Sequence, residues 1–217
     1  MDTLPLFPLP NFVLFPRCHA PLHIFEPRYR EMMEEVMAGP KKLVLAQLRP
    51  GYEADYYGAP RIHRVATVAR VLWSERTDDG RYNLLAEGAE RIEVLEDRPN
   101  GDSFRRVCFA PLLDELVAGG EERDVAIATA ECVRLAETIG LAIAPKNRSL
   151  QNMLNTHLHP GIIADVAAQV LVLDPYARQS ILEATSILRR LRLVNVQLAV
   201  LLARINAGDI ELPVADA

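Results

Sequence analysis

The spacing of apolar residues changes near Leu116, and no other feature of the sequence constrains the fold as strongly. Before Leu116, short apolar runs alternate with proline and glycine turn signals, which is typical of β-strands. After it, apolar residues recur every three or four positions, as on one face of an α-helix. We therefore predict an α+β chain of 217 residues, with a β-rich unit over residues 1–115 and a helical bundle over 116–217.

The first unit is predicted to be mostly strands with one helix. Strands are expected at residues 4–7, 13–15, 22–25, 43–48, 62–73, 82–86, 92–94 and 104–109. Asp79-Gly80 and Asn100-Gly101 are hairpin turn signals between them. One helical face is formed by Tyr29, Met32, Met33, Val36 and Met37. Many short strands with tight turns favour a closed or nearly closed antiparallel sheet.

The second unit is predicted to contain three to five helices. Apolar stripes indicate helices at about residues 125–139, 162–173 and from 181 onward, and Pro145 is expected to open a short polar helix that runs to about Leu158. Gly140 is expected to end the first helix. Asp174 is expected to be the N-cap of a helix whose first turn holds Pro175, and Ser186 the N-cap of a last helix that ends near Gly208. Arg189, Arg190 and Arg192 are expected to form a solvated basic face.

Composition excludes several classes of protein. A net charge of −5 argues against a dedicated nucleic-acid binder. The three cysteines, Cys18, Cys108 and Cys132, are far apart and form no CxxC pair, which indicates a reducing compartment such as the cytoplasm. Residues 3–15 are uncharged, but prolines interrupt them, so they fit neither a signal peptide nor a membrane span. We expect a soluble, cytoplasmic protein with no membrane partner.

The reactive side chains do not form a recognisable catalytic or metal-binding pattern. His19 and His23 have a proline between them, and His157 and His159 are two residues apart, so neither pair has helical metal-ligand spacing. Cys18 and His19 are adjacent, and sequence neighbours rarely present a thiol and an imidazole to each other. We therefore expect no catalytic residue, no metal, no cofactor and no enzymatic activity.

Two short stretches stand out as structural or binding candidates. Glu26, Pro27, Arg28 and Tyr29 lie where a strand turns into a helix, and Glu26 is expected at or beside the helix N-cap. Arg28 or Arg30 is expected to pair either with Glu26 or with a carboxylate of the sheet. Tyr52, Tyr56 and Tyr57 lie in a stretch that is predicted to be a loop. Loop aromatics are candidates for partner binding, although they equally suit covering a sheet edge.

Several blocks of the sequence resemble the N-terminal domain of Lon proteases. Residues 4–9, 13–16 and 21–30 are similar to the opening of that domain, 65–70 and 79–91 to its next blocks, and 173–191 to its closing helices. The family commonly has glycine where Arg17 and Ala66 stand, so both are expected to be turn or close-packing positions. The chain resembles a free-standing member, without the ATPase and peptidase domains of a complete Lon protease.

The resemblance implies a PUA-like β-rich pseudobarrel followed by a helical bundle. It also implies a non-catalytic module that binds unfolded or extended polypeptide segments, in the role of an adaptor for proteolysis with a separate ATPase or protease. Two alternatives remain open. One is a hydrolase that uses Cys18 or a histidine, and the other is an RNA-binding protein with a basic patch of Arg61, Arg64 and Arg70. Neither the partner nor the oligomeric state follows from the sequence.

Overall fold

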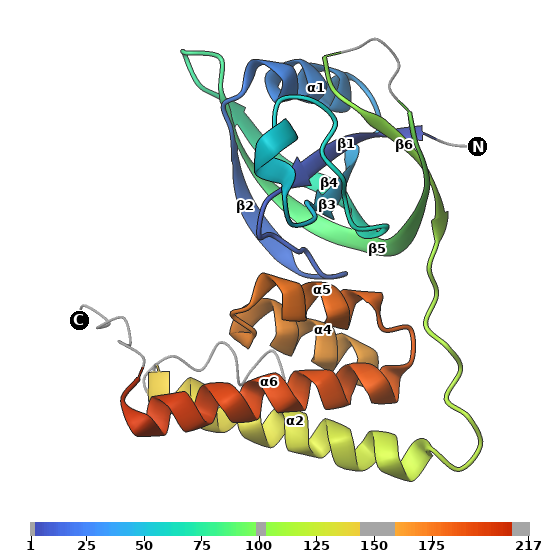
Figure 1. Ribbon diagram of the computed structural model, residues 1–217, viewed down its shortest axis with the longest axis vertical. Helices are drawn as coiled ribbons and strands as arrows, with labels where there is room; N and C mark the ends of the chain where they lie inside the picture. The colour runs from blue at the N-terminus through green and yellow to red at the C-terminus, as the bar shows by residue number, and fades with distance from the viewer. Residues whose placement is uncertain (1–2, 99–102, 144–158, 210–217) are drawn as a thin grey trace. The chain divides into compact units, whose positions relative to one another are not determined.

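The structure, a computed structural model, describes residues 3–98, 103–143 and 159–209. The chain divides into two compact units, Met1–Leu113 and Asp114–Ala217. The first unit holds the sheet and the second holds helices (Figure 1), so the predicted α+β class is confirmed. The division into domains of residues 1–115 and 116–217 stays a prediction.

The described residues of the first unit form six strands, one α-helix and one short 3-10 helix. Its strands are β1 (Thr3–Leu9), β2 (His19–Ile24), β3 (Lys42–Gln47), β4 (Val65–Arg76), β5 (Tyr82–Arg98) and β6 (Arg106–Pro111). Helix α1 (Pro27–Ala38) follows β2, and the 3-10 helix η1 (Tyr52–Asp55) follows β3. The strand predicted at residues 13–15 is wrong. These residues form an irregular segment that is nonetheless buried.

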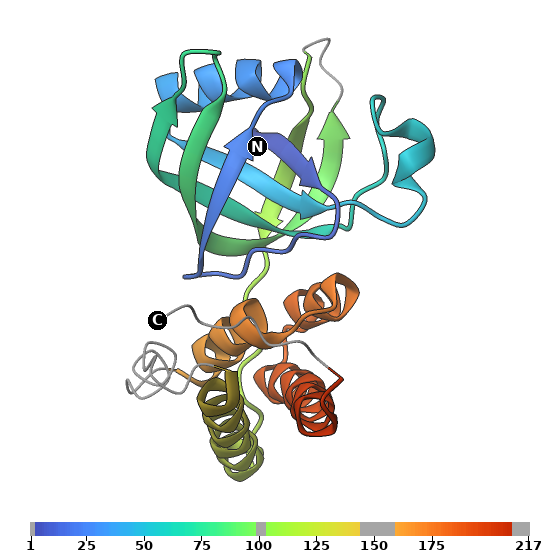
Figure 2. The same cartoon turned by 90° about the vertical axis from the view of Figure 1, so that its left-hand side faces the viewer.

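The sheet order is β2-β5-β4-β3-β1-β6, and β6 also pairs with β5. Strands β1, β3, β4, β5 and β6 therefore close into a ring, which Figure 2 shows as a small barrel. The expectation of a purely antiparallel sheet is wrong, because β1 and β3 are parallel neighbours. The chain between them passes through β2 and α1, and such a long connection permits parallel pairing.

One long strand takes the place of two predicted ones. Residues 82–86 and 92–94 both belong to β5, whose first part pairs with β2 and whose last part pairs with β6. Register shifts at Val68/Ala69 and Val94/Glu96 accompany this change of partner. Such bulges add twist to a strand, and this bending lets the ring close. The hairpin predicted at Asn100-Gly101 lies outside the described residues.

The barrel interior is an apolar core formed by residues from all five ring strands. Its buried members are Leu6, Val44, Ala46, Ala66, Val68, Ile92, Val94 and Val107. Helix α1 packs on the opposite face of β1, where the ring of Tyr29 lies edge-on to Phe7 with centroids 4.7 Å apart. Met32 and Met33 of α1 are fully buried, so the predicted helical face is a core face.

Both positions where the resembled family commonly has glycine behave as expected. Arg17 has a φ of 62°, in the left-handed region that favours glycine, and so it is a turn position. Ala66 is buried in the barrel core, and so it is a close-packing position.

The second unit packs four described helices around a shared core. They are α2 (Glu122–Ile143), α4 (Pro160–Leu171), α5 (Pro175–Glu183) and α6 (Ile187–Ala207). The predicted caps are confirmed: Asp174 accepts hydrogen bonds at the start of α5, Ser186 does so at the start of α6, and Gly208 ends α6 with a φ of 75°. Helix α2 continues past Gly140, where an end was predicted. The helix predicted at 145–158 lies outside the described residues.

The predicted solvated face of three arginines is wrong for Arg190. This side chain is fully buried, whereas Arg189 and Arg192 are exposed. The Arg190 guanidinium pairs with Asp114 and with Asp165, the latter at 3.4 Å, and donates to the Ala184 carbonyl oxygen. A run of charges in a sequence does not show which member faces inward, because that depends on the rotation of the helix against its neighbours.

Within the described parts of the chain, no helix combines the length and the apolar character that crossing a membrane requires.

Candidate functional site

The start of α1 forms a charged cluster on the surface of the first unit. Glu26 is the N-cap residue, but its side chain caps no helical N–H and instead accepts a hydrogen bond from Arg28 Nε at 3.1 Å. Pro27 occupies the first helical turn, as predicted, because its missing N–H is not needed there. The strand-to-helix junction therefore leaves the Glu26 carboxylate free to bind other groups.

The loop that carries the three tyrosines is ordered by its own backbone. Leu48 and Ile62 form an isolated β-bridge at its base, and Arg49 N–H donates to the Arg61 carbonyl oxygen at 2.8 Å. Within the loop, the Gly58 N–H donates to the carbonyl oxygen of Asp55 at 2.9 Å. A hollow of 280 Å³ lies against this loop. The backbone of the loop is therefore defined by hydrogen bonds, and this backbone carries the three tyrosine side chains.

The structure brings the two candidate stretches together. The Tyr56 hydroxyl donates to Glu26 Oε1 at 2.7 Å, across 30 residues of sequence. Arg28 Nη2 donates to the Tyr56 carbonyl oxygen at 3.2 Å. The Arg28 guanidinium carbon lies 4.5 Å from the ring centroid of Tyr29, 5.3 Å from that of Tyr56 and 5.9 Å from that of Tyr57. We call Glu26, Arg28, Tyr29, Tyr52, Tyr56 and Tyr57 the tyrosine cluster.

The members of the tyrosine cluster differ in exposure. Tyr29 is buried, Tyr56 is half-buried, and the Tyr57 side chain is 87% exposed. Tyr57 packs edge-on to Tyr56 with centroids 5.2 Å apart, and Tyr52 lies 6.2 Å from Tyr56. The cluster thus holds an exposed aromatic ring beside a guanidinium, on a support of buried and hydrogen-bonded groups.

The phenols of Tyr29 and Tyr56 both stay protonated at neutral pH. Burial raises the pKa of Tyr29 to about 12. Burial also raises the pKa of Tyr56, and its hydrogen bond to Glu26 raises it further. The Tyr56 hydroxyl therefore keeps its proton at neutral pH and donates it to Glu26 Oε1.

Replacing Glu26 with alanine is expected to destabilise the first unit by about 1.5–3 kcal/mol, because Arg28 and the Tyr56 hydroxyl both lose their acceptor. Urea unfolding of the full chain measures this change. Glu53→Ala, an exposed position in η1, is the matched control and should change the free energy of unfolding by less than about 0.5 kcal/mol. An unchanged melting temperature for Glu26→Ala would contradict the structural role of the cluster.

The residues considered for catalysis are not brought together. Cys18 is buried and His19 is exposed, so the two neighbours lie in different environments. Burial raises the pKa of Cys132 to about 12, so this thiol is a poor nucleophile. In the described parts of the chain, no group of three His, Cys, Asp or Glu residues could hold a metal ion. His157 lies outside those parts.

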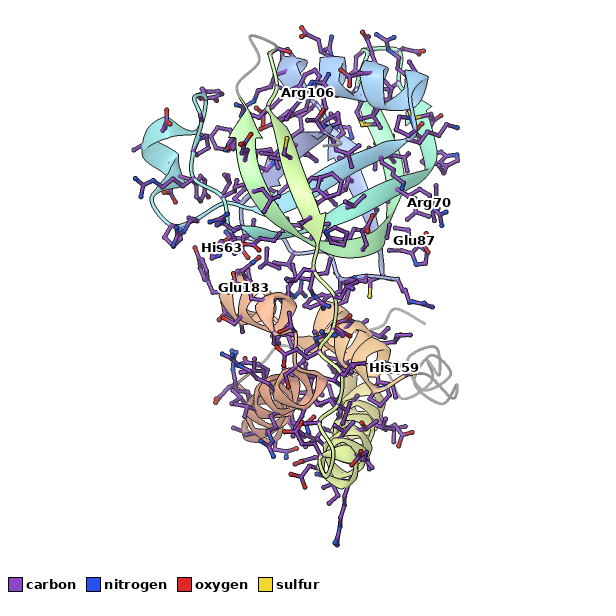
Figure 3. All side chains as sticks on the ribbon, turned by 90° about the vertical axis from the view of Figure 1, so that its right-hand side faces the viewer. His63, Arg70, Glu87, Arg106, His159 and Glu183 are labelled. Atoms are coloured by element: carbon purple, nitrogen blue, oxygen red, sulfur yellow. The ribbon has the colours of Figure 1, made fainter. Side chains whose placement is uncertain are left out.

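The arginines considered for RNA binding do not form a free basic patch. Arg64 lies 3.7 Å from the Glu93 carboxylate and donates to the Val94 carbonyl oxygen. Arg70 of β4 pairs with Glu87 of the neighbouring strand β5 at 2.5 Å, and Figure 3 shows the two side by side. Two of the three arginines therefore already neutralise carboxylates of this chain.

Comparison with known proteins identifies the family. Residues 3–200 match the family described as "ATP-dependent protease La (LON) substrate-binding domain". The chain belongs to this family of Lon substrate-binding domains, as the resemblance implied.

Two relatives with similar sequences are Lon proteases. Lon protease of Desulfosudis oleivorans is 26% identical over 212 residues, which cover 96% of this chain and 25% of that protein. Lon protease of Azospirillum brasilense is 29% identical over 192 residues, which cover 88% of this chain and 23% of that protein. The chain thus spans about a quarter of the length of these relatives.

Two solved structures share the fold. The N-terminal domain of Mycobacterium avium complex Lon protease superposes with a TM-score of 0.72 at 13% identity, covering 91% of this chain and 98% of that one. The Lon N-terminal domain protein from Xanthomonas campestris gives a TM-score of 0.60 at 19% identity, covering 88% of this chain and 96% of that one.

Proposed function

We propose that this chain binds extended or unfolded polypeptide segments without catalysing a reaction, and that the tyrosine cluster is the contact surface. The observation that carries this proposal is the Tyr57 ring, 87% exposed beside the Arg28 guanidinium. Tyrosine and arginine are the side chains that most often dominate protein interfaces, because each offers a large flat contact surface and hydrogen bonds. Membership of a family described as substrate-binding supports the same role.

The geometry of the cluster suits a polypeptide better than a small molecule. Tyr57 is 87% exposed, and Tyr52 lines the hollow of 280 Å³ beside the loop, so these two rings can contact a chain that runs across the surface. An extended segment would place apolar side chains against Tyr57 and Tyr52. The Arg28 side chain is already engaged by Glu26 and the Tyr56 carbonyl oxygen, so little of its freedom would be lost on binding.

We further propose that the chain is an adaptor that delivers bound polypeptides to a separate ATPase or protease. The complete Lon relatives, which align with this chain over only part of their length, support this proposal. A cytoplasmic location is part of the proposal. It is supported by the free cysteines Cys18, Cys108 and Cys132, all of them buried, since free thiols are usual in reducing compartments.

Removing the Tyr57 ring tests the proposed surface. We expect Tyr57→Ala to weaken binding of a fluorescently labelled, permanently unfolded protein about tenfold, which corresponds to the loss of one interface anchor of more than 1 kcal/mol. Fluorescence anisotropy measures this binding. The melting temperature should be unchanged, because the side chain is almost fully exposed.

Tyr176→Ala is the matched control, because Tyr176 is an exposed tyrosine of the second unit, 40% accessible, and lies outside the cluster. It should leave binding unchanged. Absence of any association of the unaltered chain at high micromolar concentration would overturn the proposed function. Equal binding by Tyr57→Ala and the unaltered chain would overturn the proposed surface.

A further inference from the structure

The barrel has an opening that is separate from the tyrosine cluster. This hollow of 580 Å³ is lined by residues from all five strands of the ring, among them Leu4, Lys42, Val68, Glu90 and Phe109. We call these five residues the barrel mouth. Ligand pockets commonly have volumes of about 300–1,000 Å³ and often lie in the mouths of β-barrels.

The strand register shows that the side chains of the barrel mouth face the barrel interior. Side chains alternate along a strand, so Leu4 shares a face with the core residue Leu6, and Lys42 shares one with Val44. Glu90 pairs directly with Val68 across the antiparallel strands β4 and β5, and directly paired residues lie on the same face. By the same alternation, Phe109 shares a face with Val107. The barrel mouth is therefore the next interior layer beyond the core.

Two residues of this interior layer are charged. Lys42 and Glu90 are both half-buried, and neither side chain has a hydrogen bond or an ion pair with any residue that the structure describes. Charged groups that leave bulk water normally have partners, because losing hydration is costly. Apolar side chains would fill this layer if its purpose were only to extend the core. A cation and an anion that have no partner among the described residues, above an apolar floor, instead form a site for a ligand that carries both charges.

We propose that the barrel mouth binds a small zwitterion with an apolar body, of the class of free apolar amino acids. The ligand carboxylate would pair with the Lys42 ammonium and the ligand ammonium with the Glu90 carboxylate. The apolar side chain of the ligand would pack on Leu4, Val68 and Phe109, which are partly or fully buried already. Each charged contact forms in a half-buried setting, where water screens it less than on an open surface.

The charges at the mouth disfavour the other ligand classes. A simple anion would be repelled by Glu90, and a simple cation would be repelled by Lys42. An internal polypeptide segment carries neither a backbone ammonium nor a backbone carboxylate, so it would leave both residues unpaired. The site is thus chemically distinct from the tyrosine cluster, and it does not depend on the proposed polypeptide binding.

Isothermal titration of the full chain with L-leucine and with L-phenylalanine tests the proposal. We expect saturable binding of both. N-acetyl-leucine lacks the ammonium and leucine amide lacks the carboxylate, so each should bind at least about tenfold more weakly than leucine, because one charge-assisted hydrogen bond is lost. If only leucine amide binds more weakly and N-acetyl-leucine binds as tightly as leucine, the site recognises the carboxylate alone. That result would overturn the proposal.

Two substitutions at the mouth provide the second arm of the test. Lys42→Met and Glu90→Gln keep the length of each side chain, and each should weaken leucine binding at least about tenfold. Lys41→Met and Glu75→Gln are the matched controls, because both positions are exposed and lie outside the hollow. They should leave binding unchanged.

The proposal is overturned if neither amino acid gives a saturable heat at concentrations up to about 10 mM, which is well above the range of specific binding. It is also overturned if N-acetyl-leucine and leucine amide both bind as tightly as leucine. A third contrary result is leucine binding by Lys42→Met and by Glu90→Gln that equals that of the unaltered chain, with unchanged melting temperatures. Tyr57→Ala should retain amino-acid binding in every case. Failure at the mouth is therefore distinguishable from failure of the proposed polypeptide binding.

Discussion

Arg190→Met is expected to lower the free energy of unfolding by about 3–5 kcal/mol, because it removes a buried guanidinium that pairs with two carboxylates, one of them buried. Asp165, 5% exposed, lies 3.4 Å from the Arg190 guanidinium, and Asp114 pairs with the same group. The guanidinium also donates to the Ala184 carbonyl oxygen, at 3.0 Å from Nε and 2.9 Å from Nη2. Methionine fills a similar volume but supplies none of these donors. Urea unfolding of the full chain measures the change.

The neighbouring residue Arg189 provides the control for this experiment. Its side chain is exposed, so Arg189→Met should change stability by no more than about 0.5 kcal/mol. Adding Asp165→Asn to Arg190→Met should recover part of the loss, because the buried charge that Arg190 neutralised is then removed. Equal stabilities for Arg189→Met and Arg190→Met would show that the buried ion pairs do not hold the helical unit together.

Gly88→Ala is expected to destabilise the first unit by about 3 kcal/mol, through steric conflict with backbone atoms. A Cβ atom at Gly88 would meet the Phe15 carbonyl oxygen and lie 2.9 Å from the Phe15 carbonyl carbon. The two segments cannot separate freely, because Arg17 N–H donates to the Gly88 carbonyl oxygen at 2.7 Å and Gly88 N–H donates to the Cys18 carbonyl oxygen at 2.9 Å. A backbone group cannot rotate out of the way as a side chain can.

Gly119→Ala is the matched control for the same substitution. No atom lies within 4 Å of the Cβ position there, so the melting temperature should stay within the error of the measurement. Thermal unfolding followed by circular dichroism measures both variants. A Gly88→Ala chain as stable as the unaltered one would mean that the 13–18 segment can move away from β5 at little cost.

Local signals in the sequence predicted most of the secondary structure. The N-caps at Asp174 and Ser186, the end of α6 at Gly208, and the Asp79-Gly80 turn all depend on one residue and its immediate neighbours. Errors occurred where a distant partner decides the outcome. The segment 13–15 has strand composition but lies in no strand, and the parallel pairing of β1 with β3 depends on the path of the intervening chain.

The candidate residues were found one by one, but their grouping was not. Arg28 was expected as one of two possible ion-pair partners of Glu26, and the structure shows this hydrogen bond. The contact between Glu26 and Tyr56 spans 30 residues and has no signal in a single sequence. Lys42 and Glu90 were missed because an isolated charge next to a strand core is read as a surface residue. Only the strand register shows that both face the barrel interior.

The sequence by itself determined the class of this chain, two units of different secondary structure, and its similarity to Lon substrate-binding domains. These follow from hydrophobic periodicity, capping residues and turn residues, whose effects reach only a few positions along the chain. The tertiary structure decided which charges are buried and which residues from distant segments meet: Arg190 with Asp165, Tyr56 with Glu26, and Lys42 with Glu90 around one opening. The physical reason is that burial and pairing depend on how whole elements rotate and register against one another, and local sequence does not encode that.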